Sequence, residues 1–199
     1  MRREVILIRH GETAWTAERR YCGVNDVPLN AKGKEEALLL RSELRGLSIG
    51  TVYSSDLRRA SEFARIVFSP MKVIEDAALR ELDFGQLHGM KYEEALVRFG
   101  DEYRSWIDDP ASRTLPGAER YVDMVARVRR FIERVRHTPG DGAVAVVSHV
   151  GPIRVIVAEL SGSGGREGDI IATGSARRLF IDDVGGDRHE ERGNGCLRS

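Results

Sequence analysis

Short apolar runs alternate with amphipathic stretches along most of this chain. Residues 5–8 (VILI) and 143–148 (AVAVVS) are apolar runs rich in β-branched side chains. Such runs are typical of strands that are buried on both faces of a parallel sheet. Shorter runs at residues 50–55, 71–75 and 175–182 predict three further strands.

Between these runs, apolar residues recur at helical spacing. The predicted helices cover residues 31–44, 56–68, 92–99, 120–136 and 152–160. Asn30 and Ser55 stand at the N-cap positions of the first two helices, where a side-chain oxygen accepts a bond from a free backbone N–H. Pro152 suits the first turn of the last helix, because proline lacks an N–H that this turn would leave unbonded. The glycine-rich residues 161–165 then predict a flexible loop.

The alternation of strands and helices predicts an α/β layered fold with a mainly parallel sheet. With 199 residues and 41% hydrophobic content, the chain is long enough for one substantial core. We therefore predict a single domain over residues 1–184. Residues 185–199 carry almost no apolar side chains, which predicts a disordered tail.

Charge and cysteine content narrow the class of protein. Lys and Arg together number 31, as do Asp and Glu, so charge gives no overall attraction to nucleic acid or membrane, and neither is expected as a partner. The first apolar run is too short for a signal peptide or a membrane span, which predicts a cytoplasmic protein. Cys22 and Cys196 are the only cysteines, and they form neither a disulfide framework nor a metal-binding pair.

Each of the two strongest apolar runs leads to a histidine. His10 comes after residues 5–8 and Arg9, and His149 directly follows residues 143–148. Because ligands of open α/β sheets bind beyond the carboxyl ends of the strands, both imidazoles are predicted at one ligand-binding edge. A single histidine there is more often structural; two at matched positions favour a site. Arg9 needs an anionic partner, because an unpaired guanidinium beside a buried strand would be costly.

Four motifs in order carry a family resemblance. The segments LIRHGET, YSSDLRRA, LRELDFG and VVSHVGPIR extend from Leu7 to Arg154. Together they resemble the histidine phosphatase superfamily, the cofactor-dependent phosphoglycerate mutase-like proteins. The resemblance implies a three-layer α/β/α sandwich of the phosphoglycerate mutase-like type, and an enzyme.

The resemblance also implies catalytic roles for five residues. His10 matches the nucleophile, which attacks a phosphomonoester to form a phosphohistidine. Arg9, Arg59 and His149 match the phosphate-binding positions, where charge and paired donors stabilise the phosphoryl group. Glu81 matches the general acid, which protonates the leaving oxygen and then activates water. Considered without the other motifs, Glu81 would instead be a surface carboxylate that pairs with Arg80, the residue before it.

Five further residues are assigned to substrate binding. These residues are Gly11, Thr16, Cys22, Gly23 and Val150. Gly11 is expected to let the backbone approach the phosphate closely, and the Thr16 hydroxyl to donate to it. The family often has Asn where Thr16 stands and Gln where Cys22 stands, and Val150 replaces a common glycine. Glu12 and Glu119 are weaker candidates for the pocket.

Within the superfamily, the short chain and its polar tail favour a phosphatase over a mutase. Residues 103–119 resemble the corresponding segment of α-ribazole phosphatases, which predicts a small phosphomonoester as substrate, α-ribazole 5'-phosphate among the candidates. The alternatives are a phosphoglycerate mutase and a catalytically silent protein that binds a phosphorylated ligand. No metal and no cofactor are expected, because no metal-ligand motif accompanies the histidines. The sequence leaves the oligomeric state open, a homodimer included.

Overall fold

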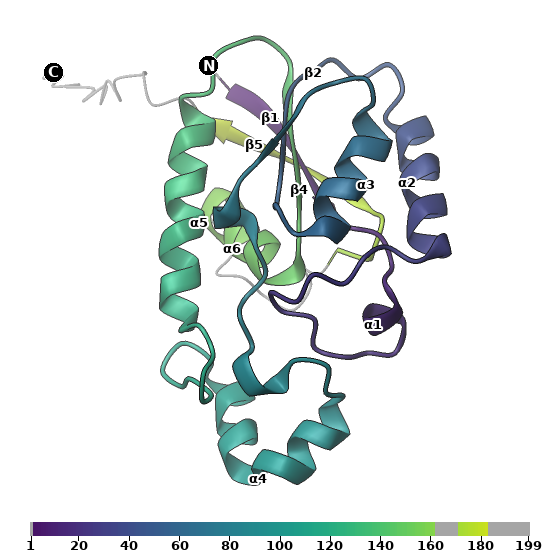
Figure 1. The fold of residues 1–199 in the computed structure, drawn as a ribbon. Helices are drawn as coiled ribbons and strands as arrows, with labels where there is room; N and C mark the ends of the chain where they lie inside the picture. Colours follow the sequence, from purple (N-terminus) through teal and green to yellow (C-terminus); the bar gives the residue numbers. More distant parts are fainter. Residues whose placement is uncertain (1, 162–170, 183–199) are drawn as a thin grey trace, which may run out of the picture.

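The computed structural model describes residues 2–161 and 171–182, and five strands in this part of the chain form one sheet (Figure 1). The strands are β1 (Arg2–Arg9), β2 (Ile49–Ser54), β3 (Val73–Glu75), β4 (Ala143–Ser148) and β5 (Ala176–Asp182), in the order β3-β2-β4-β1-β5. β1, β2, β3 and β4 run parallel to one another, and β5 pairs antiparallel with β1 at the sheet's edge. The predicted mainly parallel sheet is confirmed.

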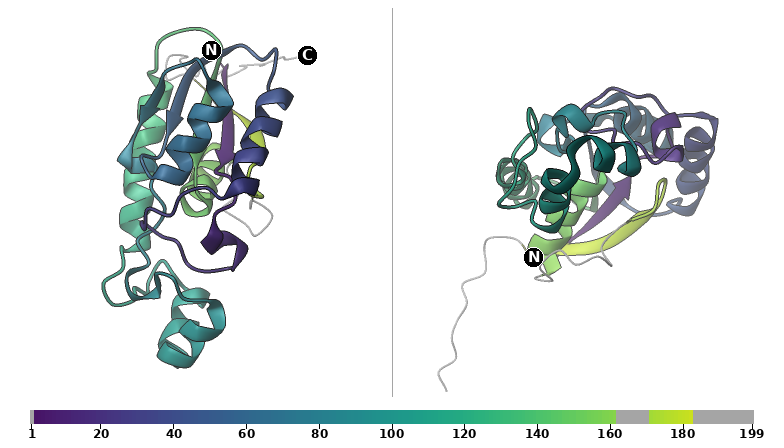
Figure 2. Two further views of the ribbon diagram at one scale, coloured as in Figure 1. Left: turned by 45° about the vertical axis from the view of Figure 1, so that its right-hand side comes forward. Right: turned by 90° about the horizontal axis from the view of Figure 1, so that it is seen from below.

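Helices cover both faces of this sheet (Figures 1 and 2). They are α1 (Ala14–Ala17), α2 (Ala31–Glu43), α3 (Arg58–Phe68), α4 (Tyr92–Asp108), α5 (Tyr121–Arg136) and α6 (Val150–Ser161), with the short 3₁₀ helices η1 (Ala77–Leu79) and η2 (Gly85–Leu87). α2 and α3 lie on one face, α5 and α6 on the other, which makes the expected three layers. α4 lies beyond the carboxyl ends of the parallel strands.

Side-chain alternation along β1 divides the core in two. Ile6 and Ile8 pack in the cluster under α2 and α3, whereas Val5 and Leu7 pack in the cluster under α5 and α6. All four side chains are at most 2% exposed. Burial on both faces is therefore why the run is uniformly apolar, and it holds the end of β1 rigidly where the site begins.

The predicted helix starts and ends were partly wrong. Asn30 caps α2 as expected, since its Oδ1 accepts the N–H of Gly33 at 2.8 Å. Ser55 does not cap α3; its hydroxyl accepts the N–H of Leu57 in a turn before the helix begins. α4 continues past the predicted end because a second helical segment follows a kink at Gly100, where φ is 52°.

Other expectations lie outside the described residues. These are most of the predicted loop at residues 161–165 and the tail at residues 185–199. Within residues 2–161 and 171–182, no helix is both long and apolar enough to cross a bilayer.

Candidate active site

The carboxyl ends of β1 and β4 bring His10 and His149 together, as predicted. Their ring centroids are 4.9 Å apart, and both residues are buried. A cavity of about 250 Å³ opens beside His10. The residues that line it are Arg9, His10, Thr16, Arg20, Tyr21, Cys22, Gly23, Arg59, Glu81, Phe84 and Val150. His149 lies behind this lining, against the His10 ring.

Backbone contacts fix the tautomer of His10. Its Nδ1 lies 2.7 Å from the carbonyl oxygen of Gly11. A carbonyl oxygen only accepts, so Nδ1 must carry the proton and Nε2 must carry the lone pair. Arg59 Nε donates to this Nε2 at 3.2 Å. His10 therefore presents an unprotonated nitrogen beside a guanidinium.

Arg59 is fully buried and held by carbonyl oxygens from the loop after α1. Its Nη1 donates to the carbonyl of Asn25 at 2.7 Å and its Nη2 to that of Gly23 at 2.6 Å. Because the third donor, Nε, faces His10, each nitrogen of the guanidinium is engaged and its orientation is fixed. The side chain comes from the first turn of α3, which follows the carboxyl end of β2.

Several polar groups beside His10 lack a partner. Both ring nitrogens of His149 and the Nε of Arg9 are buried without a hydrogen bond to any part of the chain that the structure describes. Arg9 Nη1 donates to the carbonyl of Ile171 at 3.1 Å, which anchors the side chain. Unsatisfied buried groups are uncommon in proteins, and the N–H donors among these are suited to an anionic ligand, which accepts hydrogen bonds.

Burial keeps both histidines neutral. It lowers the pKa of His10 well below 6.5, and the neighbouring charge of Arg59 lowers it further, against the opposing effect of the Gly11 carbonyl. The pKa of His149 is also well below 6.5, first because of burial and then because of Arg59. In both cases desolvation is a larger cause than the neighbouring cations.

Glu81 reaches the cavity from the loop after η1. Its Oε1 accepts the N–H of Leu82 at 2.9 Å and that of Gly151, at the start of α6, at 3.1 Å. The alternative pairing with Arg80 does not form, because Arg80 binds Asp56 with two hydrogen bonds. Glu81 is thus a buried carboxyl group beside the His10 cavity.

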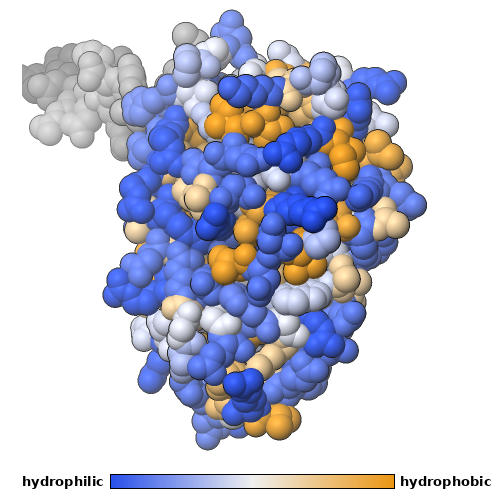
Figure 3. All heavy atoms as spheres, in the orientation of Figure 1, coloured by the Kyte–Doolittle hydropathy of each residue, from blue (hydrophilic) through white to orange (hydrophobic). Residues whose placement is uncertain are grey.

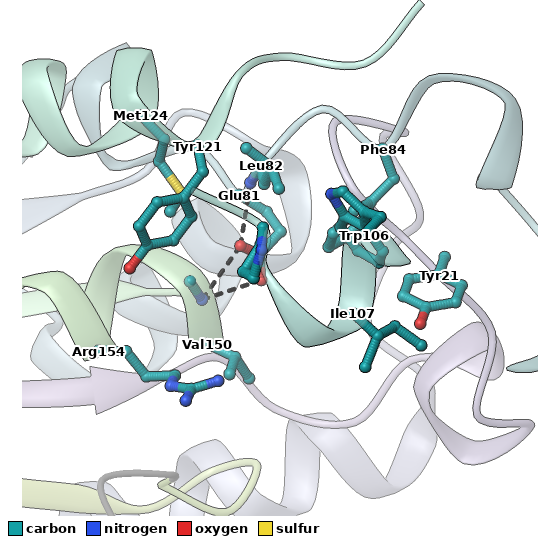
Figure 4. Close-up of a pocket in the computed structure, with 12 residues that line it drawn as sticks. Tyr21, Glu81, Leu82, Phe84, Trp106, Ile107, Tyr121, Met124, Val150 and Arg154 are labelled. Carbon is teal, nitrogen blue, oxygen red and sulfur yellow. Dashed lines mark hydrogen bonds between the residues drawn. The ribbon is translucent and has the colours of Figure 1, made fainter. Parts of the chain in front are cut away.

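Glu81 also lines a second cavity, of about 300 Å³ (Figure 4). The two share Tyr21, Glu81, Phe84 and Val150. The remaining lining of the second cavity is mainly apolar: Leu82, Trp106, Ile107, Pro110, Tyr121, Met124, Gly151 and Arg154. The sequence did not identify Trp106 as a residue that lines a cavity.

Four of the five predicted substrate-binding residues line the first cavity, and two of the predicted reasons were wrong. Thr16 does line it, but its hydroxyl donates to the carbonyl of Thr13 within the α1 capping box. Gly11 does not line it. A Cβ on Gly11 would lie 2.5 Å from the Gly33 oxygen and 2.8 Å from Phe63, so this glycine allows α2 and α3 to pack closely.

Cys22 lines the cavity as a buried thiol whose pKa is raised by burial. Gly23 has φ 51°, a conformation that favours glycine, and its carbonyl accepts from Arg59. Val150 stands where α6 begins and borders both cavities.

Glu12 and Glu119 do not line either cavity. Glu12 accepts from Asn30 and Lys32 at the start of α2. Glu119 accepts two hydrogen bonds from Arg127 on α5. Each carboxylate is thus turned toward a nearby cation or cap and away from the cavity. Among the described residues, no group of three or more His, Cys, Asp or Glu side chains is placed to hold a metal ion.

Comparison with known proteins decides the family. The sequence profile of the Histidine phosphatase superfamily (branch 1) matches residues 5–183. The chain belongs to this superfamily. Membership of this superfamily makes the protein a phosphatase, and its fold is that of the phosphoglycerate mutase-like proteins.

Relatives of this histidine phosphatase carry several names. Phosphoserine phosphatase 1 of Hydrogenobacter thermophilus is 34% identical over 163 residues, 80% of this chain and 76% of that protein. A 2,3-bisphosphoglycerate-dependent phosphoglycerate mutase 2 of Gloeobacter violaceus is 32% identical over 164 residues, 78% of this chain and 74% of the other. The crystal structure of the α-ribazole phosphatase from Shigella flexneri superposes with a TM-score of 0.80 at 28% identity, covering 88% of this chain and 89% of that one.

Proposed function

We propose that this phosphatase hydrolyses small phosphomonoesters through a phosphohistidine at His10, without a metal ion. The observation that carries the proposal is the unprotonated Nε2 of His10, which accepts from the Arg59 guanidinium, with the ring of His149 packed 4.9 Å away between ring centroids. Phosphoryl transfer to a histidine requires an unprotonated ring nitrogen that can attack phosphorus. It also requires nearby hydrogen-bond donors that can bind the phosphoryl oxygens.

In the first step, the lone pair of His10 Nε2 leaves its hydrogen bond with Arg59 Nε and attacks phosphorus, and the bond from phosphorus to the ester oxygen breaks. Arg59 and Arg9 donate to the phosphoryl oxygens, and Nδ1–H of His10 keeps its bond to the Gly11 carbonyl, which disperses the charge that develops on the ring. Protonated Glu81 gives its proton to the departing alkoxide. The alcohol leaves, and the phosphoryl group stays on His10.

In the second step, the now ionised Glu81 takes a proton from water. The resulting hydroxide attacks phosphorus, the N–P bond breaks, and inorganic phosphate is released with Glu81 protonated again. The position of Glu81 supports both steps, because its carboxyl group borders the first cavity, where the phosphate would lie, and the second, where the alcohol would lie.

The second cavity supports a substrate whose alcohol carries an apolar ring. Phe84, Trp106 and Tyr121 contribute aromatic side chains to it (Figure 4). A planar ring stacks well against such side chains and releases water from them. α-Ribazole 5'-phosphate has a planar, largely apolar base and is our leading candidate, and a neighbour of known structure is an α-ribazole phosphatase. We assign the enzyme to the cytoplasm on the sequence alone.

A second candidate is action on a carboxylate-bearing phosphomonoester, including phosphoglycerate mutase activity. Arg154 lines the second cavity and could pair with a substrate carboxylate. Relatives are named phosphoserine phosphatase and phosphoglycerate mutase. Against this reading, a carboxylate in the second cavity would be surrounded mainly by apolar side chains, which disfavour a charged group.

The test is phosphate release from a panel of phosphomonoesters in excess chelator, with His10→Asn alongside. The panel contains α-ribazole 5'-phosphate, phosphoserine and 3-phosphoglycerate. Release by the wild type and not by the variant, with a trapped phosphohistidine in acid-quenched protein, is expected. Activity of His10→Asn within tenfold of wild type would overturn the nucleophile. If no ester releases phosphate, hydrolysis is refuted. A mutase assay would then distinguish a phosphoglycerate mutase from a catalytically silent binding protein.

A further inference from the structure

One guanidinium outside both cavities holds the segment that carries Glu81. Arg127, on α5, donates to the carbonyl oxygens of Ala78 at 2.8 Å, Arg80 at 2.6 Å and Glu81 at 3.1 Å. It also donates to both carboxylate oxygens of Glu119, at 2.7 and 2.8 Å. Five hydrogen bonds from one side chain thus join α5 to two loops.

The carboxylate partner extends the same clamp. The backbone N–H of Glu119 donates to the carbonyl of Asp83 at 2.8 Å. Arg127 and Glu119 therefore grip the segment on both sides of Glu81, whose own carbonyl is one of the acceptors. The side chains of the pair are only 16% and 21% exposed. Competition from water is therefore weaker than for a surface pair.

The segment needs this support because it has little regular structure of its own. Between η1 and η2 the chain has neither helix nor strand. The carbonyl of Leu79 is fixed from the sheet by the hydroxyl of Ser148, at 2.8 Å, and Arg127 fixes the carbonyls on either side of it. The carboxyl group of Glu81 is then held by the N–H of Gly151.

We infer that Arg127 and Glu119 are positioning residues, which hold Glu81 where its proton can reach the leaving oxygen. The inference rests on the proposed role of Glu81 as general acid. It depends on the planar guanidinium fork: a lysine at position 127 keeps the charge but offers three donors from one atom, too few for the five bonds. Misplacing a catalytic group by about 1 Å can cost a hundredfold in rate.

The experiment compares two esters that differ in their need for a proton. 4-Nitrophenyl phosphate leaves as a stable phenolate without a proton, whereas 2-phenylethyl phosphate leaves as an alkoxide and requires one. We measure kcat/KM, which covers the steps up to phosphoryl transfer and omits the later attack of water. Arg127→Lys and Glu119→Gln should each lower kcat/KM for the alkyl ester about tenfold or more. The value for the nitrophenyl ester should stay within about threefold.

A second Arg–Glu pair provides the matched control. Arg129, on the same helix, binds Glu159 on α6 at 2.8 Å, on the exposed surface. Arg129→Lys and Glu159→Gln should leave both esters unchanged. Equal losses on both esters for the Arg127 and Glu119 variants would overturn the inference and leave a purely structural clamp. If Arg127→Lys does not fold, Glu119→Gln still decides, because it leaves the guanidinium on the three carbonyls.

The same assay on Glu81→Gln separates this inference from the proposed function. A selective loss on the alkyl ester in Glu81→Gln, without one in the clamp variants, overturns the clamp alone. Equal losses on both esters in Glu81→Gln would overturn the acid role itself, and the inference with it.

Discussion

The two buried histidines should make the stability of this phosphatase depend on pH below about 6.5. Burial lowers the pKa of His10 and of His149 well below 6.5 in the folded chain. In the unfolded chain both rings regain water and titrate near 6.5. Below that pH the unfolded state therefore binds more protons than the folded state, so the free energy of unfolding falls as pH falls.

The size of the effect follows from the number of groups. Each such histidine removes about 1.4 kcal/mol of stability per pH unit, between its unfolded and folded pKa values. His10 and His149 together contribute a slope of about 2.7 kcal/mol per pH unit, and His88, whose pKa is also lowered by burial, adds to it. A domain is typically stable by about 5–15 kcal/mol, so this slope would remove a large part of it within two units. Above pH 6.5 both rings are neutral in either state, and their contribution to the slope vanishes.

Urea unfolding at pH 7.5, 6.5, 6.0 and 5.5 measures the slope, at pH values where most carboxylates remain ionised. His149→Gln should lower it by about 1.4 kcal/mol per pH unit, the share of one histidine, whatever the variant does to stability at pH 7.5. His137→Gln removes an exposed imidazole at the end of α5 and is the matched control, with the wild-type slope expected. A wild-type slope near zero between pH 6.5 and 5.5, or an unchanged slope in His149→Gln, would refute the burial of neutral rings.

The remaining predictions concern Glu81, metal ions, and the packing of α2. Glu81→Gln should lower kcat/KM for alkyl phosphomonoesters by about 10²–10⁴, the usual contribution of a general acid, and affect nitrophenyl phosphate far less; parallel initial-rate assays compare the two. Excess chelator should leave the rate on any turned-over ester unchanged, and a rate restored only by an added divalent ion would contradict the metal-free reaction. Gly33→Ala should lower the urea midpoint markedly, because its Cβ would lie 2.2 Å from the Glu12 carbonyl oxygen. Gly46→Ala is the control: its new Cβ meets open space, although its φ of 90° also disfavours alanine. If its urea midpoint is at least as low as that of Gly33→Ala, the clash with the Glu12 carbonyl is not what destabilises Gly33→Ala.

The strands and the catalytic edge could be predicted because their signals are local. An apolar run such as residues 143–148 marks a buried strand by itself, and the next residue must then lie at its carboxyl end. Two runs of this kind are enough to bring His10 and His149 together in a parallel sheet. The same logic fails for Glu12, because the sequence does not say which way a loop side chain turns.

The second cavity and the clamp on Glu81 could not be predicted, because each is built from distant segments. Tyr21, Phe84 and Trp106 each have the pattern of a core aromatic, and only the fold shows that they leave a space between them. Arg127 has the pattern of an outward charge on an amphipathic helix, yet it turns toward three carbonyls of another segment. Tertiary hydrogen bonds of this kind leave no periodic signal in a sequence.

Burial of the Arg59 guanidinium and the His10 ring lowers the stability of the fold, and the same burial makes the site reactive. A fully buried guanidinium such as Arg59 is tolerated because backbone carbonyls accept its N–H groups, so the charge is fixed before any ligand arrives. Preorganised charge needs no rearrangement during the reaction, and in a site with little water it acts on a phosphoryl group with less screening. The same desolvation keeps His10 unprotonated near neutral pH, so the nucleophile and the cation beside it depend on one physical cause. A substitution that admits water to this cavity should therefore weaken both together, even where it removes neither side chain.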